Sequence, residues 1–121
     1  MPTTLLSTRN ANVRVTLPVL PPAASNKVRT DALAILEVVA RHGARFQITR
    51  ARIQTMAGLS VRRTTAALHF LRQHKFTAHV PVRKNGRVHG FCFVFDFSGN
   101  VQPPKWVLHY SQCDDLKASD R

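Results

Sequence analysis

The stretch that decides the fold runs from residue 48 to residue 71 and reads ITRARIQTMAGLSVRRTTAALHFL. Thr49 and Ser60 each precede a short segment with helical spacing of apolar residues. Their hydroxyls can cap a helix by accepting hydrogen bonds from its first backbone N–H groups. Gly58 lies between the segments and allows a tight turn. The stretch therefore predicts two short helices joined by a turn. The positions expected to be buried are Ile53, Met56, Ala57, Leu68 and Leu71.

The segment before this stretch has the pattern of a longer helix. Apolar residues recur at spacings of three and four from Val28 to Ala40. Asn26 and Thr30 are both candidate N-caps, and Gly43 is a suitable stop. We therefore expect a core helix from about residue 27 to residue 43.

The residues after Phe76 change to a period of two, which is typical of β-strands. Two such runs flank Asn85-Gly86, a strong hairpin signal because both turn positions need a positive φ. Pro81 predicts that its strand is an edge or carries a bulge. A two-residue loop pairs Lys84 with Arg87, Val82 with His89, Val80 with Phe91 and Ala78 with Phe93, and places the apolar partners on one face.

These patterns divide the chain into three parts and predict an α+β fold. Residues 1–25 contain four prolines, and we expect a partly mobile arm in which Val13, Val15 and Leu17 allow a short strand. Residues 26–110 form one domain that ends in a last strand or docking segment, and residues 111–121 form a polar tail. The 121 residues suffice for one hydrophobic core.

The charge distribution indicates an anionic partner. The chain contains 18 Lys and Arg against six Asp and Glu, a formal net charge of +12. No acid lies between Val38 and Phe95, an interval with eleven basic residues, whereas solvated surfaces usually mix both signs. Such a field favours polyanions. We expect nucleic acid rather than a membrane, because the sequence contains no long amphipathic helix with an aromatic apolar face.

Other classes of protein lack their signatures in this sequence. Cys92 and Cys113 do not make a disulfide framework, and the first ten residues lack the apolar run of a signal peptide. We expect a cytoplasmic, nucleoid-associated protein. His79 lies across from Cys92 in the predicted hairpin, but nothing supplies further ligands at the usual spacing, so no metal is expected. Without paired acids, a nucleophile motif or a Gly-rich phosphate loop, we expect neither catalysis nor a cofactor.

The order of a helix, a helix-turn-helix and a hairpin resembles the winged helix-turn-helix of small bacterial, phage or plasmid transcriptional regulators. The matching features are the capped helix after Thr49, Gly58-Leu59-Ser60 at the turn, and a following helix that opens with bases and small polar residues. The resemblance covers about residues 28–97 and implies three helices followed by a hairpin wing, with extensions at both ends. The departures are Gln54, where a small residue is usual, Thr64, where an aliphatic one is usual, and Lys75, where a Gly often ends the helix.

The resemblance implies three sets of DNA-contacting residues. The second helix of the motif would be the recognition helix, whose base-reading side holds Arg62, Arg63, Thr65, Ala66 and His69. The DNA backbone would be contacted by Thr49, Arg50, Arg52 and Ser60. The wing would consist of Arg83, Lys84, Asn85 and Arg87. Arg62 and Arg63 are the best candidates for base contact, because Arg can bond O6 and N7 of guanine together.

The function implied is sequence-specific binding of double-stranded DNA, with repression of transcription by occupancy of an operator. We expect a homodimer, because one recognition helix reads few base pairs. Its interface material would be Val13, Val15, Leu17, Leu20, Trp106, Val107, Leu108 and Tyr110, which could equally complete the core of the monomer. No small-molecule ligand is expected, because the chain has no room for a separate ligand domain.

Three alternatives remain open at this point. The chain could be an origin-binding or partition protein of a mobile element, an RNA-binding winged-helix module, or a winged helix used as a protein–protein adaptor, although the net charge argues against the last. Phe91, Phe93 and Phe95 could stack single-stranded bases, but phenylalanines at period two are more typical of a core.

Overall fold

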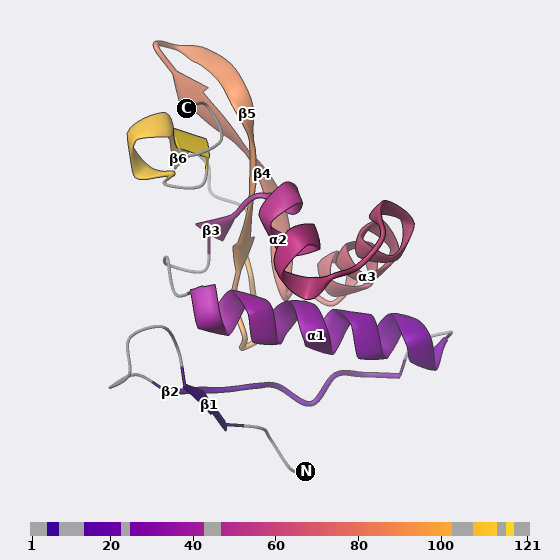
Figure 1. The fold of residues 1–121 in the computed structure, drawn as a ribbon. Coiled ribbons are helices and arrows are strands. Elements are labelled where there is room, and N and C mark those ends of the chain that lie inside the picture. Colours follow the sequence, from indigo (N-terminus) through magenta and orange to yellow (C-terminus); the bar gives the residue numbers. More distant parts are fainter. Residues whose placement is uncertain are drawn as a thin grey trace.

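The computed structural model describes residues 5–7, 14–22, 25–42, 47–102, 108–113 and 116–117. Within these ranges the chain is a mixed α+β protein with three α-helices and a four-stranded sheet, in agreement with the predicted class (Figure 1). The elements follow in the order β1 (Leu5–Ser7), β2 (Arg14–Thr16), α1 (Asn26–His42), β3 (Gln47–Ile48), α2 (Arg50–Ala57), α3 (Val61–Gln73), β4 (Thr77–Lys84), β5 (Arg87–Phe95), β6 (Leu108–His109) and a 3-10 helix, η1 (Tyr110–Gln112). Across these ranges, no helix combines the length and the apolar character that crossing a membrane requires.

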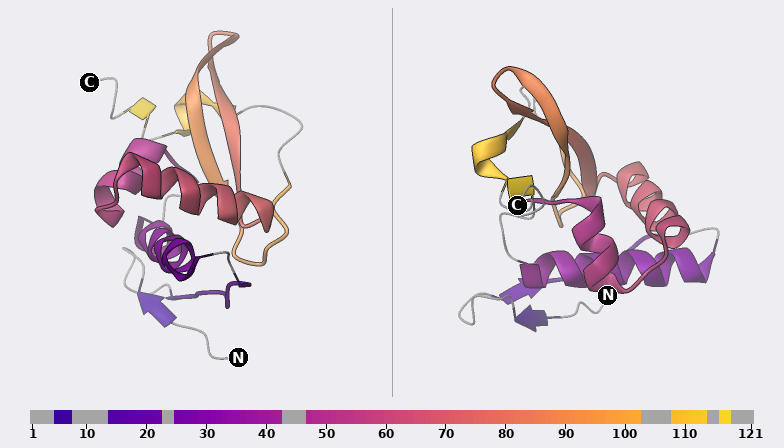
Figure 2. Two further views of the ribbon diagram at one scale, coloured as in Figure 1. Left: turned by 90° about the vertical axis from the view of Figure 1, so that its right-hand side faces the viewer. Right: turned by 45° about the horizontal axis from the view of Figure 1, so that its top comes forward.

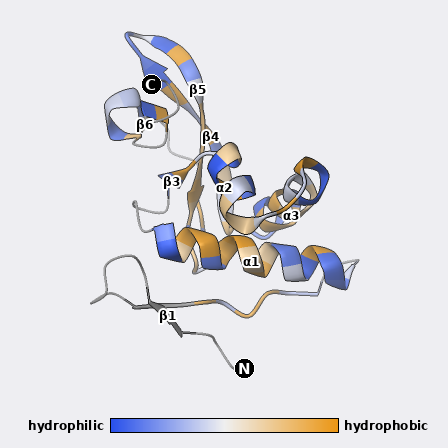
Figure 3. Ribbon diagram, viewed as in Figure 1, coloured by the Kyte–Doolittle hydropathy of each residue, from blue (hydrophilic) through white to orange (hydrophobic). Residues whose placement is uncertain are grey.

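Helix α1 provides the centre of the main core, and its apolar middle turns lie beside α2 and α3 (Figure 3). The predicted apolar positions from Ala32 to Ala40 are buried there, because spacings of three and four bring them to one side of the helix. The helix begins at Asn26, and the Ser25 hydroxyl accepts a hydrogen bond from the backbone N–H of Lys27 at 3.2 Å. The capping residue is therefore Ser25, one residue before the earlier of the two candidate caps. Gly43, the predicted stop, lies outside the described residues.

Helices α2 and α3 have the predicted caps and turn. The hydroxyls of Thr49 and Ser60 each accept a hydrogen bond from the backbone N–H three residues later, at 3.2 Å. Gly58 has a φ of 66°, the left-handed conformation that glycine adopts at little cost. Met56 is 41% exposed, so its predicted burial is wrong, because the eight-residue α2 buries only Ile53 fully. The other predicted positions, Ala57, Leu68 and Leu71, pack in or against the core.

The end of α3 shows how a residue other than glycine closes this helix. Lys75 takes a φ of 60° at the place where the winged-helix pattern often has a glycine. The N–H of Phe76 donates to the carbonyl of Leu71 at 3.0 Å, which satisfies an end carbonyl of the helix. The last helical residue is Gln73, two residues before Lys75.

Strands β4 and β5 form the predicted hairpin around Asn85-Gly86, where φ is 54° and 80°. Lys84 pairs with Arg87 as predicted. Between the pairs Arg83–Val88 and Pro81–Phe91, however, β4 contributes one residue and β5 contributes two, His89 and Gly90. This is a β-bulge on β5, and Gly90 adopts a φ of 132° within it.

The bulge corrects the predicted register from Val82 onward. The observed pairs are Pro81–Phe91, Val80–Cys92, His79–Phe93, Ala78–Val94 and Thr77–Phe95. Directly opposed residues share a face. The odd-numbered phenylalanines therefore lie with His79 rather than with Val80, and the predicted shared face is wrong. Strand β4 lies between β5 and β6 and the bulge lies on β5, so the prediction that the strand of Pro81 is an edge or carries a bulge is wrong. The bulge lies opposite Val82, next to Pro81.

Two apolar clusters lie on opposite faces of the hairpin. The main core joins α1, α2, α3 and β3 to Phe93 and Phe95. The second cluster lies on the other face, where the segment containing β6 and η1 covers the strands (Figures 1 and 2). Its buried members are Ala78, Val80, Val82, Cys92, Leu108 and Cys113. The hairpin is thus packed from both sides near its base, while its turn projects beyond the helices (Figure 2).

The described parts of both extensions pack on the domain. Leu17 and Leu20 are buried in the main core, and the guanidinium of Arg29 donates to the carbonyl of Leu20 at 3.0 and 3.3 Å. The predicted strand of the arm is β2, which pairs with β1. Cys113 is buried and Leu116 packs against the second cluster, so packing continues past the predicted boundary at residue 110.

The residues proposed for a dimer interface take part in the packing of the single chain. Leu17, Leu20 and Leu108 are buried in it, and Tyr110 packs against the second cluster. Val15 lies in β2, and Val13, Trp106 and Val107 lie outside the described residues. The alternative that these residues complete the core is therefore confirmed for Leu17, Leu20, Leu108 and Tyr110.

Candidate nucleic-acid interface

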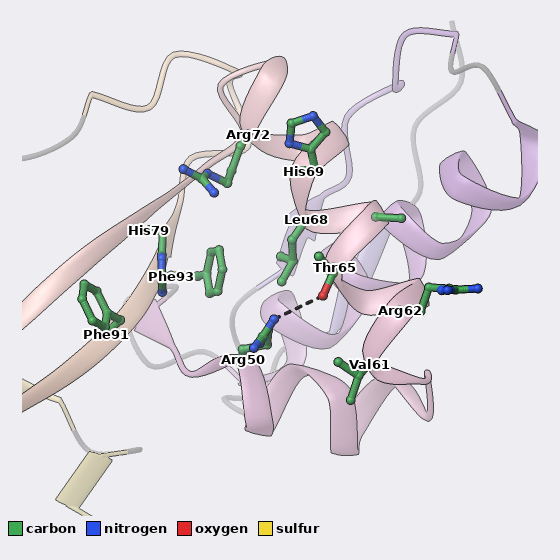
Figure 4. A pocket seen from close by; sticks show the side chains of 11 residues that line it. Arg50, Val61, Arg62, Thr65, Leu68, His69, Arg72, His79, Phe91 and Phe93 are labelled. Atoms are coloured by element: carbon green, nitrogen blue, oxygen red, sulfur yellow. Dashed lines mark hydrogen bonds between the residues drawn. The ribbon is translucent and has the colours of Figure 1, made fainter.

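A groove of about 1020 Å³ lies between the exposed side of α3 and the helix-facing side of the β4–β5 hairpin (Figure 4). The first residue of α2 also borders it. The described lining consists of Arg50, Val61, Arg62, Thr65, Ala66, Leu68, His69, Arg72, His79, Phe91 and Phe93. No Asp or Glu is among these lining residues, so the groove combines cationic with apolar surface.

Helix α3 supplies one wall of the groove. Residues 62, 65, 66, 69 and 72 follow one another at helical spacings, and all five are exposed. The predicted exposure of Arg62, Thr65, Ala66 and His69 is therefore confirmed. The short side chains at 65 and 66 leave the helix backbone accessible at the middle of this wall.

Arg50 links α2 to this wall. Its Nη1 donates to the Thr65 hydroxyl at 3.2 Å, and its guanidinium lies at one end of the groove (Figure 4). The hydroxyls of Thr49 and Ser60 act as helix caps, and Arg52 is exposed outside the groove lining. Of the four residues predicted for the DNA backbone, the structure thus brings Arg50 to the groove.

Arg63 does not line the groove, although it was a best candidate for base contact. Its Nε and Nη2 donate to the two carboxylate oxygens of Asp31 in α1, at 3.0 and 2.6 Å. Asp31 is 4% exposed. The hydrogen bonds to this carboxylate raise the pKa of Arg63, and the bidentate geometry fixes α3 against α1. The prediction that Arg63 belongs to the base-reading side with Arg62 therefore gives way to a structural ion pair.

The hairpin supplies an aromatic wall. The imidazole of His79 lies between two rings: Phe91, with centroids 4.8 Å apart and planes inclined by 33°, and Phe93, at 4.5 Å and 20°. Phe93 is buried, whereas Phe91 is 49% exposed. Partial burial and the positive charges of Arg72 and Arg50 lower the pKa of His79. The imidazole therefore favours its neutral form in the free groove.

The predicted wing residues lie at the β4–β5 turn, which is the far end of the hairpin from the helices (Figure 1), and they do not line the groove. Nη1 of Arg83 donates to the carbonyl of Gly86 at 3.0 Å. Nζ of Lys84 lies 4.4 Å from the ring centroid of Tyr110, on the side covered by η1. Asn85 and Arg87 are exposed at the turn. The structure keeps the four residues together but separates them from α3.

Six residues of the described groove lining are missing from the predicted DNA-contacting sets: Val61, Leu68, Arg72, His79, Phe91 and Phe93. Arg72 follows His69 by three positions, so helical spacing alone indicated it. Phe91 and His79 depend on the strand register. An isolated glycine within a strand, here Gly90, is a signal for a bulge, and a bulge at this place brings the two rings to one face.

A smaller hollow of about 310 Å³ adjoins the groove and shares Arg72 and His79 with it. Lys75 and Gln102 also line this hollow, and its described lining again includes no carboxylate. The basic surface therefore continues past the end of α3.

The chemistry of the groove suits a polyanion that carries planar rings, because guanidinium groups bind phosphates and aromatic faces stack on other rings. Across the described residues, no three His, Cys, Asp or Glu side chains gather in a way that could hold a metal ion. His79 faces Phe93, not the predicted Cys92. Comparisons of the chain with protein-family models, with curated proteins and with solved structures gave no significant match.

Proposed function

We propose that the chain is a winged helix-turn-helix protein that binds double-stranded DNA, with α3 as its recognition helix. The observation that carries the proposal is the groove beside α3, where Arg50, Arg62 and Arg72 meet short side chains and no carboxylate of the described lining opposes them. The order of three helices followed by the β4–β5 hairpin is the order that the resemblance implies. The net charge of +12 supports a polyanionic partner.

In this proposal the N-terminal half of α3 enters the major groove. Arg62 is exposed in the first turn, where recognition helices contact base edges, and its guanidinium can bond O6 and N7 of a guanine. Thr65, Ala66 and His69 follow on the same side. Arg63 acts indirectly, because its ion pair with Asp31 holds α3 at a fixed angle on α1.

Phosphate contacts supply most of the affinity. Arg50, Arg52 and Arg72 lie near the ends of α2 and α3, and the hairpin turn presents further bases, Arg83, Lys84 and Arg87. Each phosphate that these residues neutralise releases counterions from the DNA. Binding should therefore weaken steeply as the salt concentration rises.

We further propose that a homodimer occupies an operator in the cytoplasm and blocks transcription without any chemical step. A two-fold site would double the few base pairs that one recognition helix can read. Since Leu17, Leu20 and Leu108 are buried within the chain, the interface would use other residues. Light scattering of the protein alone and on its selected site tests this proposal, and a monomeric mass in both states would contradict it.

Titration of duplex DNA at several salt concentrations tests the binding proposal. A site selected from a random duplex pool serves as the specific probe. We expect Arg62→Ala to cost about 1–3 kcal/mol on this site, the range for one base-reading arginine, and less on random DNA. Arg41→Ala is the matched control, because Arg41 is exposed in the last turn of α1 and does not line the groove. A salt-independent affinity, or equal losses from both substitutions, would contradict the proposal.

A further inference from the structure

One part of the groove is not explained by binding to paired DNA. Phe91 is 49% exposed, although its strand neighbours Phe93 and Phe95 are buried in the main core. It is held in this position by the backbone, because the bulge at His89-Gly90 turns Phe91 toward the groove. A bulge next to a site commonly re-aims a side chain. The exposed position of the Phe91 ring in the groove is therefore determined by the backbone of β5.

The rings form a stack that ends at the solvent. Phe93 is the buried member, His79 lies between, and Phe91 is the outer member (Figure 4). Aromatic faces of this kind bind planar rings, and stacking on them tolerates any base because every base has a π-face. Bases inside a duplex already stack on their neighbours, so a paired base cannot offer its face to Phe91.

The cations lie where a nucleic-acid backbone would need them. In the view of Figure 4, Arg72 lies above His79 and Phe93 and Arg50 lies below Phe93, and both are close enough to His79 for their charges to act on its imidazole. Lys75 extends the basic surface into the adjoining hollow. The volume of about 1020 Å³ lies at the upper end of the range for ligand pockets and leaves room for more than a single base.

We propose that the groove binds one unpaired nucleotide of a DNA strand, with its base on Phe91 and His79 and its flanking phosphates at Arg50 and Arg72. This inference rests on the proposed function, because α3 must hold the adjoining duplex. The preferred partner is then a duplex that carries an extra or extruded nucleotide. An apolar peptide would cover the rings but would leave the three guanidinium groups of the groove without anions.

Three duplexes of the same sequence test the inference. One is fully paired, one carries an extra central adenosine, and one carries an extra abasic site at that place. We expect fluorescence anisotropy to give about tenfold tighter binding of the adenosine bulge than of the other two, the order expected for one stacked base. The abasic duplex separates stacking from the flexibility that any bulge introduces.

Two substitutions assign the effect to the ring. Phe91→Ala should remove the preference for the adenosine bulge, so that this variant binds the three duplexes with similar affinity. Val88→Ala is the matched control, because Val88 is 52% exposed on the same hairpin and does not line the groove. Phe91→Trp should keep the preference, and the fluorescence of its new indole should be quenched by the adenosine bulge and not by the abasic one. Circular dichroism checks that each variant is folded.

The outcomes separate the two proposals. Equal affinity of the wild-type protein for all three duplexes, or a preference that survives Phe91→Ala, overturns the stacking inference and leaves duplex binding intact. No binding to any duplex overturns the proposed function. In that case the corresponding single strand decides: binding that Phe91→Ala abolishes supports stacking, and binding that Phe91→Ala leaves unchanged, or no binding, overturns it as well.

Discussion

The two faces of the β4–β5 hairpin differ in how completely the rest of the chain covers them. On one face, Val80, Val82 and Cys92 are buried beneath the segment that contains Leu108 and Cys113. On the other face, the helices bury Phe93 but stop short of Phe91. The same two strands therefore carry a closed core on one side and an open, basic groove on the other. A protein that needed the hairpin only for stability would gain by closing both sides.

Truncation of one apolar side chain on each face tests most directly whether the two faces differ in how much they contribute to the free energy of unfolding. Leu108→Ala removes a buried side chain from the closed face, and we expect a loss of about 2–4 kcal/mol in the free energy of unfolding. Phe91→Ala on the open face should cost less than about 1 kcal/mol, because half of the ring is already exposed. Urea unfolding followed by circular dichroism measures both. Similar losses would mean that Phe91 belongs to the core.

The helical wall of the open groove can be loosened by one substitution. Arg63→Ala leaves the buried Asp31 carboxylate without its bidentate partner, so we expect a clear loss of stability, together with weaker binding to specific and random DNA alike. Arg62→Ala, one residue earlier and exposed in the groove, should leave stability unchanged and weaken mainly the specific site. Thermal unfolding and DNA titration of both variants make the test. An unchanged melting temperature in Arg63→Ala would show that the ion pair does not hold the wall.

The bulge that separates the two faces can be strained at Gly90. An alanine there would have to adopt a φ of 132°, and its Cβ would lie 3.2 Å from Cδ2 of Leu116. We expect Gly90→Ala to cost about 1–3 kcal/mol and to weaken the preference for an unpaired nucleotide, because Phe91 would be displaced. Gly99→Ala is the comparison outside the hairpin, since Gly99 also has a positive φ, 78°, but follows β5. An intact preference in Gly90→Ala would mean that the bulge is not needed to present Phe91.

The smallest expected effect is the contribution of His79 to the pH dependence of stability. The pKa of His79 is lowered by partial burial and by Arg72 and Arg50. Just below the usual histidine pKa of about 6.5, the unfolded chain therefore binds a proton here that the native state does not. Stability should fall slightly as the pH drops through this window, and His79→Gln should remove that part of the loss. An NMR titration gives the pKa directly, and a value at or above the usual one in the DNA-free protein would contradict this account. Bound phosphates should raise it.

The elements of the fold that the sequence predicts correctly are those that depend on residues close together in the chain. Thr49, Gly58 and Ser60 act within three or four residues of the chain, and the caps and the turn they predict are present. Asn85-Gly86 likewise fixes the first strand pairs. Met56 was misplaced because helical spacing in a two-turn helix does not say how wide the buried stripe is.

The site was less predictable because its parts come from distant positions. Helical spacing gave the exposed side of α3, but it could not reveal that Asp31 in α1 takes Arg63 out of that side. The aromatic wall depends on the register beyond the bulge. At the bulge, a Cβ on Gly90 would come within 3.2 Å of Cδ2 of Leu116, a residue distant in the sequence. The Asn85-Gly86 turn predicts the strand pairs next to it, but it cannot predict the register beyond a bulge further along the strand.

The extra residue in β5 also links the length of this strand to the face of the hairpin on which each of its side chains lies. In a regular pair, side chains alternate strictly, so the parity of the distance from the turn decides which face each one takes. The bulge shifts this alternation by one residue along β5, between Arg87 near the turn and Phe91 at the base, while β4 keeps its regular alternation. Regular pairing of all the residues of β5, without the bulge, would exchange its two faces at the base and would send the phenylalanines into the closed core and Cys92 into the groove. Removal of His89 or Gly90 would instead give regular pairing with both faces as they are. At its present length between the turn and Phe91, β5 therefore needs the bulge to place Phe91 in the groove, whereas a strand one residue shorter would place it there by regular alternation.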